Sequence, residues 1–139
     1  MQIRPFQPSD EEAVVALWRQ CGLTRPWNDP YNDIARKLTE QPELFLVGTV
    51  DGRPIATAMI GFVGHRGWGY YLAVAPKYRK QAHGTALMRE AEQLLIARGC
   101  PKINLLVRSS NAGVIDFYRA LGYSQDESVS LGKRLIPDN

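Results

Sequence analysis

Residues 44–74 constrain the fold more than any other stretch, because segments typical of β-strands follow one another there with only short turns between them. The three segments, rich in apolar and β-branched residues, are Leu44–Val50, Arg53–Val63 and Trp68–Val74. Asp51-Gly52 is a strong signal for a tight hairpin turn, and residues 64–67 supply a second turn. The pattern predicts an antiparallel meander of three strands.

Periodicity typical of helices flanks the meander on both sides. It covers residues 9–21, 31–39, 83–98 and 111–122. Ser9 and Glu12 form a capping-box pattern at the first helix, and Asn111 can cap the last one. Further β-type segments are Ile3–Phe6, Ile103–Val107 and a last strand pair within Tyr123–Leu135. The predicted order is therefore β-α-α-β-β-β-α-β-α-β.

One part of this order fixes the type of sheet. Residues 68–107 run strand, helix, strand, and such a unit favours parallel neighbours. A parallel pair beside an antiparallel meander gives a mixed, mostly antiparallel sheet, in the α/β (α+β) class. At 139 residues the chain suits a single domain, which we place at residues 1–139.

Composition excludes several classes of protein. With 45% hydrophobic and 22% charged residues, the chain is typical of a folded soluble protein. No apolar run approaches the roughly 20 residues that span a bilayer, and no apolar leader segment is visible, so we expect no membrane association and a cytoplasmic location. The net charge of +3 does not by itself indicate nucleic-acid binding. Neither histidine has partners at metal-ligand spacing, and we expect no metal.

The basic segment between the third meander strand and the next helix is a candidate anion site. The first N–H groups of a helix are unpaired and lie at the positive end of its dipole, so they attract phosphate. Arg79 and Lys80 add charge at this point, while small residues at 82 and 84 let the backbone approach a ligand closely. These features suit a diphosphate. The alternative is an ordinary solvated basic turn.

The motifs around this loop resemble the GNAT superfamily of N-acetyltransferases. The family pattern is Arg or Gln, two residues, Gly, one residue, then Gly or Ala, after a strand ending near Val-x-Pro; Val74-Ala75-Pro76 and residues 79–84 match it. Asn111, Phe117-Tyr118 and Gly122-Tyr123 resemble the later part of the pattern. TRPWNDP, HRG and SLGKRL further resemble the small bacterial YpeA subfamily. The resemblance covers nearly the whole chain and implies a sheet with helices on both faces.

The resemblance also implies acetyl-CoA as cosubstrate and an N-acetyltransferase activity in which an amine attacks the thioester directly. The cofactor-binding residues it implies are Leu72, Val74, Arg79, Lys80, Gln81, Ala82, His83, Gly84, Thr85, Asn111 and Tyr118. Tyr118 is the implied catalytic acid for the leaving thiolate, and a tyrosine is protonated at neutral pH. Ala82 departs from the family glycine: alanine serves if the position needs only a small residue, and acetyl-CoA affinity falls if it needs a glycine backbone.

A general base is absent from the place where many relatives carry a glutamate, because residues 70–73 contain no carboxylate. A water chain or a residue elsewhere (Asp29, Asp33 or Asp116) could take the proton, or the amine could arrive neutral. At pH 7.5 an α-amine with a pKa near 8 is roughly a quarter neutral, whereas a lysine side chain is neutral about once in a thousand. A weak base therefore favours an α-amine or another amine of low pKa.

Residues 24–33 lie between the first two helices, where relatives cover the acceptor site. We expect Trp27, Asn28 and Asp29 to bind an amine-bearing small molecule or peptide. The alternative is a rigid surface loop with Trp27 in the core and Asp29 capping the second helix. The alternative function is a non-catalytic acyl-CoA sensor of the same fold. A nucleic-acid-binding domain is disfavoured because the basic residues are too few and too local, so we expect no nucleic-acid partner. The oligomeric state is also open, although a homodimer is compatible with the sequence.

Overall fold

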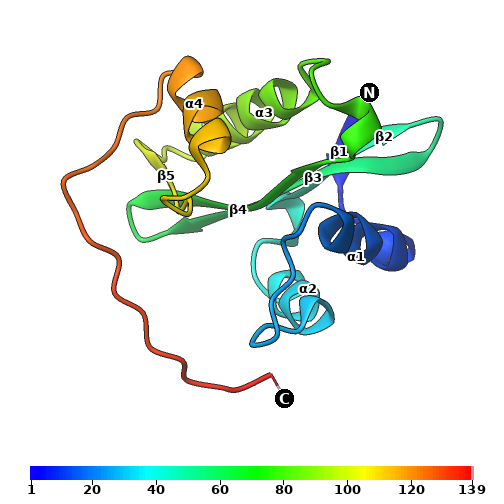
Figure 1. Cartoon of the computed structure of the whole chain (residues 1–139), viewed down its shortest axis with the longest axis horizontal. Helices are drawn as coiled ribbons and strands as arrows, with labels where there is room; N and C mark the ends of the chain where they lie inside the picture. The colour runs from blue at the N-terminus through cyan, green and yellow to red at the C-terminus, as the bar shows by residue number, and fades with distance from the viewer. Residues whose placement is uncertain (139) are drawn as a thin grey trace.

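The computed structural model describes residues 1–138, and its elements follow the predicted order up to the last helix (Figure 1). The strands are β1 (Gln2–Pro5), β2 (Phe45–Val50), β3 (Arg53–Val63), β4 (Arg66–Val74) and β5 (Ile103–Leu105). The helices are α1 (Glu11–Gln20), α2 (Pro30–Leu38), α3 (His83–Ala97) and α4 (Ala112–Ala120), with short 3₁₀ turns at Pro8–Asp10, Pro42–Leu44 and Pro76–Tyr78.

The five strands form one sheet in the order β1-β2-β3-β4-β5. Every neighbouring pair is antiparallel except β4 and β5, which are parallel. This confirms the mixed, mostly antiparallel sheet. Asp51 and Gly52, with φ of 52° and 76°, make the tight turn between β2 and β3, because both take the left-handed conformation that such hairpins require.

Helices cover both faces of the sheet, as expected. In Figure 1, α1 and α2 lie on one side, while α3 and α4 lie on the other. The first face buries Trp18 and Ile34 against Phe45 and Val47. The second face buries α3 residues against the alternate side chains of β2 and β3, among them Leu46, Ala58, Ile60, Leu87 and Leu95. The apolar side chains that alternate along β2 and β3 thus pack into two separate layers, one on each face of the sheet.

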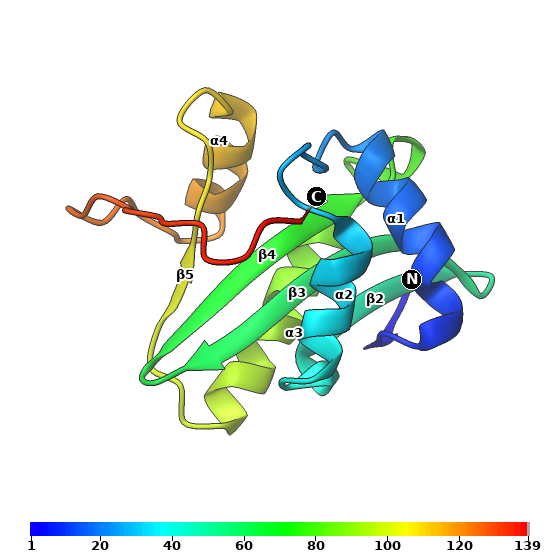
Figure 2. The same cartoon turned by 90° about the horizontal axis from the view of Figure 1, so that it is seen from below.

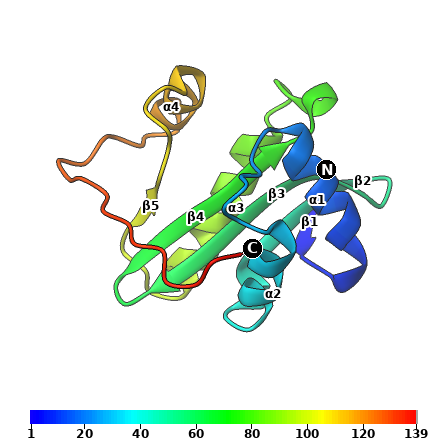
Figure 3. The same cartoon turned by 60° about the horizontal axis from the view of Figure 1, so that its bottom comes forward.

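The predicted last strand pair within Tyr123–Leu135 is wrong. Residues 124–138 form no strand but an extended arm that leaves α4 and ends beside α2 (Figure 3). Its apolar side chains stay in solvent: Val129 is 84% exposed and Leu131 is 92% exposed. Polar contacts hold the arm instead. Asp126 accepts hydrogen bonds from Lys102 and Asn104 near its start, and Asp138 is bound near its end.

The predicted capping box of Ser9 and Glu12 is also wrong, because the capping contacts lie two residues earlier, at Gln7 and Asp10. A 3₁₀ turn precedes α1, and the Asp10 carboxylate accepts the backbone N–H of Gln7 at 2.8 Å. Arg4 donates two hydrogen bonds to the same carboxylate, at 2.7 and 2.9 Å. A buried carboxylate with these donors holds β1 to the start of α1.

These hydrogen bonds make part of the stability pH-dependent. The Arg4 guanidinium, helped by the Gln7 N–H, lowers the pKa of Asp10 below its ordinary 3.8. The stabilisation is therefore complete above the unfolded-state pKa of 3.8 and is lost as the pH falls through the lowered folded-state pKa. We expect Asp10→Asn to cost about 1–3 kcal/mol at pH 7 and to lose less on acidification than the parent. Urea unfolding at neutral and acidic pH measures both; curves that stay parallel down to acidic pH would contradict the assignment.

Candidate active site

The end of β4 is distorted by one extra residue. Thr57 of β3 pairs with Ala73, but Met59, two residues further on, pairs with Tyr70, three residues back. Tyr71 sits in this bulge with φ of 50°. The bulge aims the Tyr71 side chain at the face covered by α1 and α2, where its ring stacks on Trp18 at 3.8 Å between centroids.

Buried polar groups hold the bulge in place. The Thr57 hydroxyl donates to the Tyr71 carbonyl at 2.7 Å and accepts the Trp18 indole N–H at 2.9 Å. Thr57 is fully buried, so this relay satisfies each of the groups it joins. The geometry of β4 at the bulge is therefore fixed by the core.

Beyond the bulge, β4 and β5 separate. They pair only from Gly67 to Gly69 of β4, and the two strands then diverge (Figure 2). A cleft of about 1310 Å³ opens there. The residues that line it include Trp27, Asn28, Asp33, Arg36, Tyr71, Leu72, Met88, Asn111 and Tyr118. It thus brings together residues from α2, β4, α3 and α4 with the loop before α2.

Tyr118 reaches this cleft from α4. Its side chain is buried, and burial raises the pKa of its hydroxyl to about 12. Its ring meets Phe117 and Tyr123 edge-on, at 5.1 and 5.5 Å. Tyr118 therefore stays protonated at every pH at which the protein is expected to work, with its ring fixed by two aromatic neighbours.

The loop before α3 is largely exposed, and none of the predicted cofactor residues from Val74 to Thr85 lines the cleft, although Leu72 of β4 and Met88 of α3 do. Ala82 is the N-cap of α3, and its carbonyl accepts the N–H of Ala86, while no side chain caps the helix start. The first N–H groups of α3, from His83 onward, have no partner within the helix. Gly84 lies close to both neighbouring elements, because a Cβ added there would be 3.2 Å from Phe117 and 3.8 Å from Val74. A helix start with no side-chain cap thus borders the end of β4 at Val74.

Not every residue expected in the loop points toward a ligand position. Arg79 turns back: its Nε donates to the Val74 carbonyl at 3.0 Å, and its Nη2 lies 3.4 Å from the Cys21 sulfur. Gln81 donates to the Lys77 carbonyl at 3.3 Å. Arg79 therefore ties the loop to the end of β4. The roles of Lys80 and Gln81 in cofactor binding remain predictions.

Ala82 adopts the conformation that favours glycine, with φ of 64° and ψ of 17°. That conformation costs an alanine roughly 1–2 kcal/mol. A glycine at position 82 would avoid this cost, but it would lose about 0.5–1 kcal/mol more than alanine through its larger loss of conformational entropy on folding. We expect Ala82→Gly to raise the free energy of unfolding by about 0.5–1 kcal/mol in urea denaturation. Ala86→Gly, one turn into the same helix, should instead lower it by about 1 kcal/mol. A loss of stability in Ala82→Gly would contradict the strain.

The three residues predicted to bind substrate in the loop before α2 have two different roles: two line the cleft and one caps the helix. Trp27 is 57% exposed at the cleft, so it is not a core residue. Asn28 also lines the cleft, and its side-chain oxygen accepts a hydrogen bond from Arg134 at 2.5 Å. The Asp29 carboxylate caps α2 by accepting the N–H of Tyr31 at 2.9 Å. The alternative reading of the loop is thus right for Asp29 and wrong for Trp27.

Asp33 is the candidate base that the fold places in the cleft. Its Oδ2 accepts the Tyr71 hydroxyl at 2.6 Å, and its Oδ1 accepts Arg36 at 2.9 Å. Burial, together with the nearby Asp33 carboxylate, raises the pKa of Tyr71 above its usual range, so Tyr71 remains a donor to Asp33. Asp116 is exposed on α4 and does not line the cleft.

The sequence analysis did not name Arg36, which lines the cleft, or Asp138, which binds it. Arg36 is one turn after Asp33 on α2, a spacing that could have paired them. Nothing near Asp138 indicates its contacts with Asp29 and Arg36, which lie more than 100 residues earlier. Among residues 1–138, no group of three or more His, Cys, Asp or Glu side chains is placed to hold a metal ion. Within the same part of the chain, no helix is both long and apolar enough to cross a membrane.

The family model and the relatives that match this chain are those of acetyltransferases. Residues 11–123 match the model of the acetyltransferase (GNAT) family. An acetyltransferase of Yersinia enterocolitica is 51% identical over 138 residues, which are 99% of this chain and 98% of that protein.

Solved structures resemble the fold over most of its length. A putative acetyltransferase of Agrobacterium tumefaciens superposes with a TM-score of 0.82 at 19% identity, covering 96% of this chain and 100% of the other. The ribosomal-protein-S18-alanine N-acetyltransferase of Escherichia coli gives 0.74 at 25% identity, covering 90% and 78%. PaiA N-acetyltransferase of Thermoplasma acidophilum, solved with coenzyme A, gives 0.73 at 19% identity, covering 92% of both chains.

Proposed function

The chain belongs to the acetyltransferase (GNAT) family, and from this we propose that it transfers an acetyl group from acetyl-CoA to the nitrogen of an amine. The observation that carries the proposal is the divergence of β4 and β5, which opens the cleft that Leu72, Asn111 and Tyr118 line. The thioester arm can lie in this cleft, and the start of α3, which borders the end of β4 at Val74, can supply donors for the diphosphate. The neighbour solved with coenzyme A has the same fold, which supports this cosubstrate.

The diphosphate is assigned to the start of α3. Its unpaired N–H groups supply donors there, and the exposed Lys80 adds a positive charge next to them. Gly84 leaves room at the helix start, since a Cβ at this position would lie 3.2 Å from Phe117 and 3.8 Å from Val74. Arg79 is assigned a positioning role: its hydrogen bond to the Val74 carbonyl holds the loop against the end of β4.

The acetyl group is assigned to the region beside the bulge. The amine nitrogen attacks the thioester carbonyl carbon, the carbon–sulfur bond breaks, and the amine gives up a proton while the sulfur gains one. With a pKa near 12, Tyr118 is a weaker acid than a thiol near 8.5, so complete proton transfer to the sulfur is uphill by roughly 5 kcal/mol. Most of its contribution therefore comes from a hydrogen bond to the sulfur as charge develops there.

Asp33 is the proposed acceptor of the amine proton, directly or through water. Of the three candidate carboxylates, only Asp33 lines the cleft; Asp29 caps α2, and Asp116 is exposed on α4. Arg36 donates to one of its oxygens and Tyr71 to the other, so each oxygen of Asp33 already accepts a hydrogen bond before the amine arrives. An amine that is partly neutral at physiological pH, such as an α-amine, makes the smallest demand on such a group. The alanine-specific name of one structural neighbour agrees with this class of acceptor.

A non-catalytic acyl-CoA sensor would share the diphosphate site but release no thiol. The test is to measure thiol release from acetyl-CoA with a panel of amines, next to a thermal-shift titration with acetyl-CoA alone. We expect acetyl-CoA to raise the melting temperature, and at least one α-amine to release thiol above the rate without amine. A raised melting temperature with no release across a broad panel would establish the sensor instead.

A further inference from the structure

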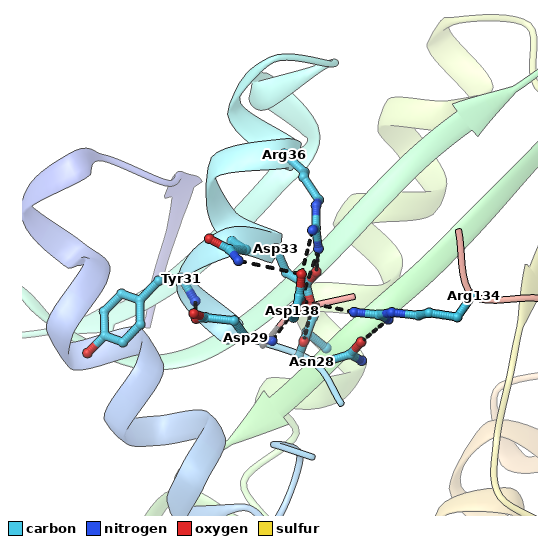
Figure 4. A network of polar contacts seen from close by, with 9 residues as sticks. Asn28, Asp29, Tyr31, Asp33, Arg36, Arg134 and Asp138 are labelled. Carbon is cyan, nitrogen blue, oxygen red and sulfur yellow. Dashed lines mark hydrogen bonds and ion pairs between the residues drawn. The ribbon is translucent and has the colours of Figure 1, made fainter. Parts of the chain in front are cut away.

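The carboxylate of Asp138 is bound mainly by donors from α2 and its N-cap, more than 100 residues earlier, and also by Arg134 of its own arm (Figure 4). Its Oδ2 accepts the backbone N–H of Asp29 at 2.8 Å, and its Oδ1 accepts Arg36 Nη2 at 2.6 Å. Arg36 Nη1 completes a fork at 3.2 Å, and Arg134 Nη2 lies 3.1 Å away. The Asp138 side chain is only 1% exposed. This arrangement is a complete binding site for one carboxylate.

The site is held by the core and does not depend on the arm that occupies it. Arg36 is fixed by Asp33, Asp33 accepts the Tyr71 hydroxyl, and the Tyr71 ring is stacked on the buried Trp18. The Asp29 N–H lies at the start of α2, where the helix dipole favours an anion. We call Asp29 N–H, Asn32 and Arg36 the carboxylate cradle, since these groups bind Asp138 from one element.

The arm that carries Asp138 is weakly attached elsewhere. Between residues 127 and 137, the described contacts to the rest of the protein include a single side-chain hydrogen bond, from Arg134 to Asn28. Leu131 is 92% exposed and Leu135 is 82% exposed, so the arm buries little apolar surface that would resist its release. A free ligand with a carboxylate can therefore compete with Asp138 for the cradle.

One member of the cradle, Arg36, lines the cleft. Asn28, Asp33 and Arg36 line the same cleft as Tyr118. Among its lining residues are four cations (Arg25, Arg36, Lys37 and Arg108) and two carboxylates (Asp33 and Glu40), an excess of positive charge that favours an anionic ligand. A guanidinium fork is also the side-chain group that best fits the planar shape of a carboxylate.

We propose that the cradle is the carboxylate subsite of the acceptor pocket, that the acceptor is an amine which also carries a carboxylate, and that Asp138 occupies the subsite until the acceptor displaces it. This inference rests on the proposed acetyl transfer and names its substrate class, an amino acid or short peptide. Asp138 acts as an internal competitor, so it raises the KM of the acceptor without touching the acetyl-CoA loop.

The kinetic test compares acceptors that differ only in the carboxylate, such as an amino acid and its primary amide. Arg36→Gln should lower kcat/KM about 10- to 150-fold more for the acid than for the amide, the usual effect of losing a hydrogen bond to a charged group, since any effect through the hydrogen bond of Arg36 to Asp33 falls on both acceptors alike. Arg36→Lys, which keeps the charge but loses the fork, should give a smaller loss for the acid. An equal loss for acid and amide in Arg36→Gln would overturn the subsite.

The arm is tested with two matched substitutions. Asp138→Asn should lower the KM of the acid acceptor several-fold and leave the KM of acetyl-CoA unchanged. Asp126→Asn removes a carboxylate of the same arm that pairs with Lys102 near β5, and it should leave both values unchanged. A KM for the acid that is the same in the parent and in Asp138→Asn would exclude Asp138 as a competitor.

A binding measurement separates this inference from the catalytic proposal. In an amide NMR spectrum of Asp138→Asn, acetate should shift the Asp29 N–H, and chloride at equal ionic strength should not. The acetate effect should vanish when Arg36→Gln is added. If no amine is acetylated but acetate shifts Asp29, the proposed function fails and the carboxylate site stands. If acetate and chloride act alike while transfer occurs, the site fails alone.

Discussion

Replacing Tyr118 by phenylalanine is expected to lower kcat by about 10- to 150-fold, with the KM for acetyl-CoA changing less than threefold. The substitution keeps the ring that packs between Phe117 and Tyr123 and removes only the hydroxyl. The hydroxyl's hydrogen bond is needed when negative charge appears on sulfur, a condition of the transition state and not of bound acetyl-CoA. Steady-state kinetics with saturating amine measures both constants.

Tyr123→Phe is the matched control for this prediction. Tyr123 is another partly buried tyrosine in contact with the Tyr118 ring, but its hydroxyl donates to Glu92 at 2.6 Å. Its removal should cost some stability and leave kcat within about threefold. An unchanged kcat in Tyr118→Phe, or an equal loss in both variants, would remove Tyr118 from the mechanism.

Placing a negative charge at Gly84 is expected to weaken acetyl-CoA binding by roughly a hundredfold. A carboxylate about 5 Å from a diphosphate charge costs about 3 kcal/mol at an effective dielectric constant of 20. The same carboxylate lies in the first turn of α3, where the helix dipole stabilises it. Gly84→Asp should therefore unfold no more easily than Gly84→Ala, although it binds acetyl-CoA far more weakly.

Gly84→Ala controls for the added Cβ, which meets Phe117 at 3.2 Å in both variants. We expect the alanine variant to bind acetyl-CoA within a few-fold of the parent in isothermal titration calorimetry. The difference between the two variants should shrink at high salt, since exposed charges are screened. Equal affinities of Gly84→Asp and Gly84→Ala would mean that the diphosphate does not bind at the start of α3.

The sheet could be predicted from sequence because its signals are local. The alternation in Arg53–Val63 and the Asp51-Gly52 turn place β3 and the hairpin as observed. The strand pair predicted within Tyr123–Leu135 does not form, because a strand also needs a partner edge, and sequence alone does not supply one. Polar contacts at the two ends of the arm, to Lys102 and Arg36, decided its path instead.

The site was partly predictable for a similar reason. The start of α3, Asn111 and Tyr118 lie in short motifs with a local pattern, so they could be named in advance. Ala82 could be identified as a departure from the motif, but its positive φ could not. The Arg36–Asp138 pair joins residues 102 apart, and nothing near either residue indicates the other. Contacts of this kind depend on the tertiary fold.

The central claim is that this chain moves an acetyl group from sulfur to nitrogen. The most direct test incubates the protein with acetyl-CoA carrying a deuterated acetyl group and a panel of α-amines, and follows both products by mass spectrometry. The account predicts an amide with the deuterated acetyl group, formed in amounts equal to the coenzyme A released and strongly reduced in Tyr118→Phe. Coenzyme A released without any acetylated amine, or acetyl-CoA bound and left intact by every amine, would contradict it.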